Sequence, residues 1–186
     1  MTKRGYVRAI SYSLALVVAL AVWGTMNYSD ARYYKVRLES NYQQNLNALD
    51  ESLNSIESDL TKSLYSNSDT QLISLNEQLY AETNTAINSL SGLPITQMNL
   101  ANTYKFLTQV SDYSKYIAEK LSKGEKITKE EYKNLNELLK YCKKFDDSVA
   151  EMVSLCNNGG EITAKNIKSS SSDVNVSLIS NSFSSY

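Results

Sequence analysis

The sequence predicts an all-α protein in which an N-terminal transmembrane helix is followed by an antiparallel four-helix bundle with long helices and a disordered, Ser-rich tail. Three observations lead to this prediction. One uncharged, apolar run lies near the N-terminus, at residues 9–29. The 186 residues include one proline and six glycines, too few turn residues for an all-β fold. Four later segments repeat apolar residues at steps of three and four, as amphipathic helices do.

The run at residues 9–29 is long enough to cross a bilayer, because a helix rises about 1.5 Å per residue and the hydrocarbon core is roughly 30 Å thick. Lys3, Arg4 and Arg8 precede it, so the positive-inside rule keeps residues 1–8 in the cytoplasm. We therefore expect a single-pass membrane protein, N-in and C-out, with its bulk outside the cytoplasm.

A cleavable signal peptide is the alternative, since Ala19 and Ala21 have the spacing that a signal peptidase prefers. Cleavage there would leave Val22 and Trp23 as an apolar stub, and the run exceeds the usual apolar region of ~7–15 residues. A retained signal anchor fits the sequence better.

Beyond the anchor, residues 30–41 are expected to form a helical stalk and residues 42–160 an extracytoplasmic helical bundle. Nothing between Asp30 and Tyr65 breaks a helix. The apolar stripe of this first helix consists of Tyr42, Leu46, Leu49, Leu53, Ile56, Leu60 and Leu64.

A second helix is expected after the polar turn at residues 66–70. Ser68 followed by Gln71 predicts a capping box at its start. Gly92 can close this helix, and Pro94 cannot extend it. Its apolar stripe consists of Leu72, Leu75, Leu79, Thr83, Ala86 and Leu90.

A third helix is expected to begin at Thr96, whose side chain can cap it, and to end at residues 122–126. The small residues of its inward face predict close contact with a neighbouring helix. That face consists of Leu100, Tyr104, Leu107, Ser111, Ser114, Ile117 and Leu121, with Phe106 and Val110 beside it.

The fourth helix has the clearest start signal, a capping box formed by Thr128 and Glu131. Residues 157–160 stop it, and residues 161–186 form a Ser-rich linker or tail. The stripe of the fourth helix consists of Tyr132, Leu135, Leu139, Cys142, Phe145, Val149, Val153 and Cys156.

The composition argues against an enzyme and against a nucleic-acid-binding protein. The chain has no histidine, so it lacks the usual general acid or base and the usual zinc ligand. A net charge of −1 leaves no strongly basic footprint. We expect no catalytic residue, no metal, no cofactor, no nucleic-acid partner and no small-molecule substrate.

Adjacent carboxylates occur at residues 50–51, 130–131 and 146–147, but neighbours on a helix point about 100° apart and do not converge on one site. We expect these carboxylates on solvated faces, with Glu130 and Glu131 favoured at a helix N-terminus.

Cys142 and Cys156 lie too far apart along one helix to form a disulfide with each other.

Several short segments give the chain a family resemblance. They are Leu93-Pro94, then Thr103-Tyr-Lys-Phe-Leu107, then Val110-Ser-Asp-Tyr-Ser114, and Thr128-Lys-Glu-Glu-Tyr132. In order and spacing the chain resembles the amino-terminal half of the spore germination protein YpeB family. Ser111 stands where that family usually has glycine. The family continues into PepSY-type repeats, so we expect this chain to be an amino-terminal fragment.

The resemblance implies a non-enzymatic protein of the spore inner membrane or intermembrane space. Its implied partner is a cortex-lytic enzyme similar to SleB, which it retains and stabilises. The candidate partner-binding or packing motif is Leu93, Pro94, Phe106, Asp112 and Tyr113. The alternative function is an extracytoplasmic four-helix sensory module that binds a small ligand. Such receptors normally need a second membrane span, and no second apolar run of that length follows Met26.

Overall fold

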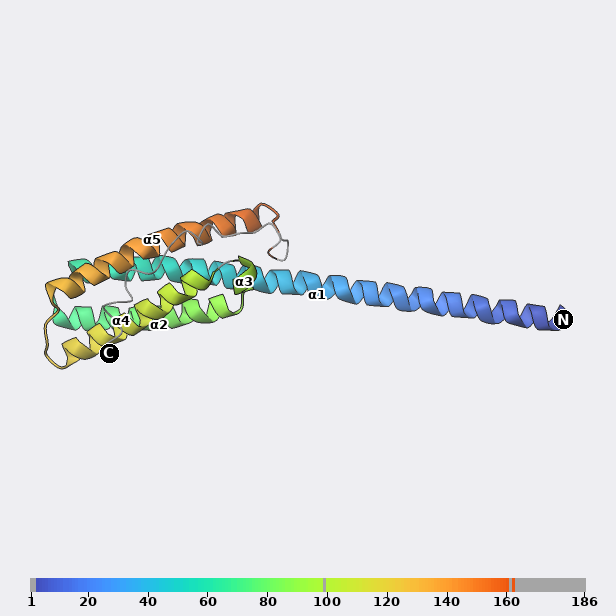
Figure 1. The fold of residues 1–186 in the computed structure, drawn as a ribbon, viewed down its shortest axis with the longest axis horizontal. Helices are drawn as coiled ribbons and strands as arrows, with labels where there is room; N and C mark the ends of the chain where they lie inside the picture. Colours follow the sequence, from blue (N-terminus) through green and yellow to red (C-terminus); the bar gives the residue numbers. More distant parts are fainter. Residues whose placement is uncertain (1–2, 99, 161, 163–186) are drawn as a thin grey trace. The chain divides into compact units, whose positions relative to one another are not determined.

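The computed structural model describes residues 3–98, 100–160 and 162, and these residues form helices and turns without a strand. The all-α prediction is therefore confirmed for the described chain. The elements are α1 (Lys3–Tyr65), α2 (Asp69–Ser91), α3 (Ile95–Met98), α4 (Ala101–Ser122) and α5 (Lys129–Asn157) (Figure 1). The chain divides into two compact units, residues 1–40 and residues 41–186, which we describe separately.

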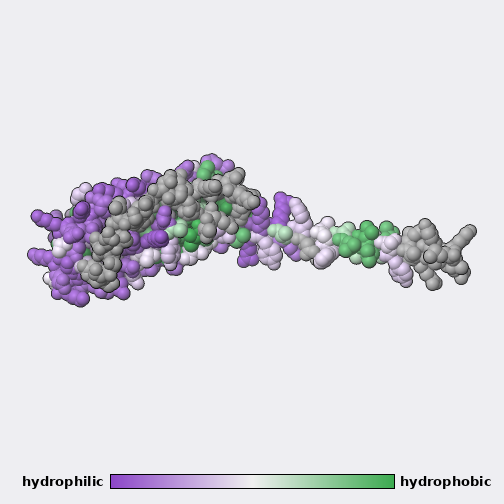
Figure 2. All heavy atoms as spheres, in the orientation of Figure 1, coloured by the Kyte–Doolittle hydropathy of each residue, from purple (hydrophilic) through white to green (hydrophobic). Residues whose placement is uncertain are grey.

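The first unit contains the apolar part of α1. Leu16, Val18 and Trp23 keep 61%, 55% and 66% of their surface exposed. Among the described residues, α1 is the one helix whose length and apolar character suit a membrane span, and Figure 2 shows its hydrophobic surface. Apolar surface of this kind is unfavourable in water, so it is compatible with membrane anchoring.

The second unit is built around one apolar core to which all four long helices contribute. Leu49 of α1, Leu79 of α2, Phe106 of α4 and Phe145 of α5 are fully buried members of this core. Ile162, which lies in the range predicted as a tail, is also buried there. The remainder of the predicted tail lies outside the described residues.

The inward faces predicted for the first two helices are confirmed. All six stripe residues of α2 are buried. In α1, Tyr42 and Leu64 are partly buried at the two ends of the stripe. Its buried members are Leu46, Leu49, Leu53, Ile56 and Leu60.

Among the described helices, α2 and α4 have the most extensive close approach of their backbones. Both helices bury small side chains: Thr83 and Ala86 on α2, and Ser111, Ser114 and Ala118 on α4. Short side chains let two helix backbones come together without steric overlap. The close contact expected from the small residues of the third predicted helix is confirmed.

The predicted start of the third helix is wrong. Thr96 lies inside the short helix α3, and α4 begins at Ala101 with Leu100 at its N-cap position. The reason lies in the turn after Pro94, whose carbonyl accepts a hydrogen bond from the Met98 amide at 3.0 Å. This bond closes a separate helical turn ahead of α4.

The predicted capping box of α2 is also absent. Ser68 occupies the N-cap position, but its side chain makes no capping hydrogen bond. The Gln71 side chain instead accepts a hydrogen bond from the Ser66 hydroxyl, with 3.1 Å between Oγ and Oε1. At the other end Gly92 closes α2 as predicted, and a Cβ atom at this position would overlap the Asn45 side chain.

Most members of the stripes predicted for α4 and α5 are buried, but the buried faces of both helices are broader than predicted. Tyr104, expected inside, is 42% exposed, whereas Phe106, expected beside the stripe, is fully buried. Phe106 extends the buried face of α4, because its ring packs on Phe145 with 4.9 Å between centroids. In α5, Tyr132 is only partly buried. Additional buried residues of α5 are Leu138, Tyr141, Ser148 and Met152.

Candidate functional site

The five residues of the predicted motif do not form one exposed surface. Leu93, Phe106 and Tyr113 are buried at 5%, 0% and 1% exposure. Pro94 is partly buried and Asp112 is exposed. The three buried members therefore serve packing, and a partner could reach only Pro94 and Asp112 without unfolding the unit.

Tyr113 leads to a polar network centred on Glu131, at the start of α5. The Tyr113 hydroxyl donates a hydrogen bond to the Glu131 backbone carbonyl at 2.9 Å. The Glu131 carboxylate accepts bonds from Lys120 Nζ at 2.7 and 2.9 Å and from the Tyr116 hydroxyl at 2.7 Å. This network ties α4 to α5 next to the loop that connects them.

The same carboxylate completes the predicted capping box, which is confirmed. Glu131 accepts a hydrogen bond from the Thr128 backbone amide, and the Thr128 side chain accepts one from the Glu131 amide. The expectation that Glu131 lies on a solvated face is wrong, because the residue is 8% exposed. Its partners on α4 compensate for the loss of hydration.

The ionised form of Glu131 is strongly favoured. Burial alone would raise the pKa of this carboxyl, but the hydrogen bonds from Lys120, the Thr128 amide and Tyr116 outweigh it and lower the pKa to about 2. Glu131 therefore stays charged near neutral pH, and it acts as a structural anion rather than as a proton donor.

A second group of carboxylates lies between α1 and α5. Asp50 and Asp146 are partly buried, and their Oδ1 atoms are buried without a hydrogen bond from the described residues. Burial and then the nearby charges of Asp50, Glu57 and Asp147 raise the pKa of Asp146 to about 6. Burial followed by the charge of Glu51 also raises the pKa of Asp50.

The charge of Asp50 on α1 acts on Asp146 on α5, a pairing across two helices that the prediction for adjacent residues did not consider. Neighbours along one helix do diverge, but residues on two packed helices can face each other. Because burial and the neighbouring charges disfavour its ionised form, the Asp146 carboxyl takes up a proton at mildly acidic pH. Among the described residues, no group of three or more potential ligands could hold a metal ion.

Both cysteines are buried, and neither forms a disulfide with the described residues. The Cys142 thiol donates a weak hydrogen bond to the Leu53 carbonyl, with 3.6 Å between Sγ and O. Burial raises the pKa of this thiol, so it is a poor nucleophile. Cys142 therefore contributes to the α1–α5 packing, which agrees with its place in the apolar stripe predicted for the fourth helix.

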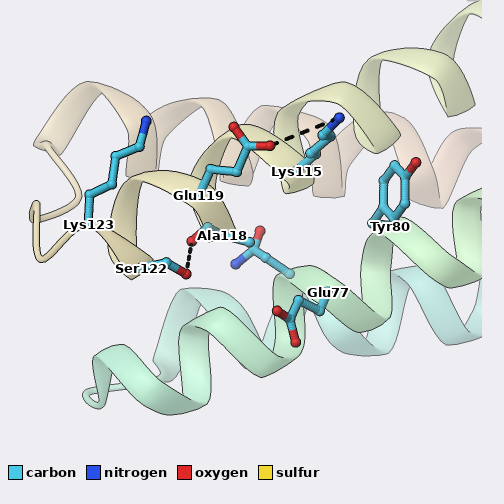
Figure 3. A pocket seen from close by; sticks show the side chains of 8 residues that line it. Glu77, Tyr80, Lys115, Ala118, Glu119, Ser122 and Lys123 are labelled. Atoms are coloured by element: carbon cyan, nitrogen blue, oxygen red, sulfur yellow. Dashed lines mark hydrogen bonds and ion pairs between the residues drawn. The ribbon is translucent and has the colours of Figure 1, made fainter.

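A groove of about 410 Å³ lies between α2 and α4 (Figure 3). The sequence does not predict this groove, because apolar periodicity identifies the buried faces of helices and not the margins between them. The lining residues are Asn76, Glu77 and Tyr80 on one side, and Lys115, Ala118, Glu119, Ser122 and Lys123 on the other. A second groove, of about 550 Å³, is lined mainly by polar residues of α1 and α2.

Comparison with known proteins gives one positive finding. The family model described as YpeB N-terminal matches residues 30–163. Neither the curated proteins nor the solved structures contain a match.

Proposed function

This chain belongs to the YpeB N-terminal family, and from that membership we propose that it is a membrane-anchored, non-enzymatic protein that retains and stabilises a cortex-lytic enzyme similar to SleB. The match over residues 30–163 is the observation that carries the proposal. It covers most of the chain and relates the protein to spore germination.

The anchor is the first part of this proposal. The exposed side chains of Leu16, Val18 and Trp23 support burial of α1 in lipid. Lys3, Arg4 and Arg8 lie before this segment and support an N-in, C-out orientation. The helical unit would then stand outside the cytoplasm, at the spore inner membrane or in the intermembrane space.

The second part is a scaffold without chemistry of its own. Short connections at residues 66–68 and 123–128 support an antiparallel arrangement of the four long helices. The buried carboxylate of Glu131 is used to cap α5 and to bind Lys120. A rigid unit stabilised in this way suits a protein that presents a fixed surface to a partner.

The proposal is tested by the amount of the cortex-lytic enzyme in dormant spores. We compare a strain that produces the full chain with one that produces the chain without residues 42–160 but with its anchor. Immunoblots quantify both the enzyme and the remaining anchor segment. We expect the enzyme to be lost although the anchor segment persists. Unchanged enzyme abundance would refute the proposed function.

A further inference from the structure

The groove between α2 and α4 has the size and lining of a small-molecule site. Its volume of about 410 Å³ lies within the range of ~300–1,000 Å³ that is typical of such sites. Tyr80, 41% exposed, and the methyl group of Ala118 give it an apolar part (Figure 3). Polar groups stand on both sides of that part.

The α2 side of the groove offers hydrogen-bond acceptors. Asn76 is fully buried, and its Nδ2 donates to the Leu72 carbonyl at 2.8 Å. That bond fixes the orientation of the amide, and the opposite atom, Oδ1, accepts no hydrogen bond from the described residues. An unsatisfied buried carbonyl is costly, and a donor brought by a ligand would relieve that cost. Glu77, the neighbouring residue, is exposed and adds a carboxylate.

The α4 side offers a cation. Lys115 Nζ lies 4.0 Å from Glu119 Oε1, so these two side chains form an ion pair with no net charge. Lys123, which follows α4, forms no ion pair with the described residues. The groove thus has an acceptor side at Asn76 and Glu77 and a cationic side at Lys123.

We propose that this groove binds a small zwitterion, an apolar amino acid or a short peptide with free ends. The ammonium group of the ligand lies against Asn76 and Glu77, and its carboxylate lies against Lys123. Its apolar side chain packs against Tyr80 and Ala118. This ligand site is separate from the retention of an enzyme and does not depend on it.

The test measures binding of defined probes to the full chain in detergent micelles by isothermal titration calorimetry. The probes are L-leucine and the dipeptide Leu-Leu, each with free ends, with an acetylated N-terminus and with an amidated C-terminus. We expect a probe with free ends to bind and either cap to weaken binding about tenfold or more, because each cap removes one charge-assisted contact. Stronger binding of L-leucine would identify a free amino acid as the ligand, and stronger binding of the dipeptide a peptide.

Two substitutions assign the two ends of the ligand. Lys123→Gln should weaken binding of the probe with free ends but not of the amidated probe, which lacks the carboxylate. Glu77→Gln should weaken binding of the probe with free ends but not of the acetylated probe, which lacks the ammonium group. Lys126→Gln and Glu125→Gln are matched controls, because both residues are exposed and lie outside the groove lining. No binding by either probe, or binding that neither the caps nor the groove substitutions change, would overturn the proposal.

Discussion

Substitution of Glu131 tests whether the network at the α4–α5 loop stabilises the helical unit. Glu131→Gln keeps a side chain that can still cap α5, but it removes the negative charge opposite Lys120. The side chains of Lys120 and Glu131 are only 13% and 11% exposed, so the lysine would be left as a largely buried, unpaired cation. We therefore expect a substantial loss of stability from this one-atom change.

The magnitude follows from the pKa of Glu131, which falls from 4.5 to about 2 on folding and corresponds to roughly 3 kcal/mol of unfolding free energy. Because the pKa is lower in the folded protein, this stabilisation is fully present above about pH 5 and is lost as the pH falls toward about 2. The difference between wild type and Glu131→Gln should therefore shrink on acidification.

The assay is urea unfolding of the full chain in mild detergent, followed by far-ultraviolet circular dichroism. Glu130→Gln is the matched control, because Glu130 precedes Glu131 in the same helical turn but is exposed. We expect this control to cost at most about 1 kcal/mol, the scale of an exposed charge at a helix N-terminus. Equal effects of the two substitutions, or an effect of Glu131→Gln that persists undiminished in acid, would refute the reasoning.

Four further outcomes follow from the structure. Phe106→Ala should cost about 3–5 kcal/mol in urea unfolding, because Phe106 is fully buried against Phe145. Asp146→Asn should raise stability by on the order of 1 kcal/mol above about pH 6, because the raised pKa of Asp146 makes the wild type less stable as the pH rises from about 4 to 6. Val18→Arg should move the chain from the membrane fraction to the soluble fraction relative to Val18→Leu, since a charge at the bilayer centre costs about 2.5–3.5 kcal/mol. Cys142 should resist alkylation, detected by mass spectrometry, until the chain unfolds.

The sequence predicts local features of this fold well. The stripe from Leu46 to Leu60 is buried as expected, because a period of 3.6 residues places these side chains on one face of α1. The capping box of α5 could also be predicted, because Thr128 and Glu131 bind each other and lie only three residues apart in the sequence. The start of α4 could not, because the turn after Pro94 competes with a helix that begins at Thr96.

Features that depend on pairs of helices were missed. Periodicity in α4 does not reveal that Lys120 meets Glu131, and periodicity in α1 does not reveal that Asp50 approaches Asp146. Both depend on the rotation and register of two packed helices, which tertiary contacts such as Phe106 on Phe145 decide. The α2–α4 groove was missed for the same reason.

Retention of a cortex-lytic enzyme at a membrane is tested most directly by flotation of vesicles. The purified full chain is reconstituted into phospholipid vesicles, purified cortex-lytic enzyme is added, and the mixture is centrifuged through a density gradient. We predict that the enzyme floats with vesicles that contain the chain and stays in the dense fractions with vesicles that lack it. An enzyme that distributes identically in the two gradients would contradict the proposed function.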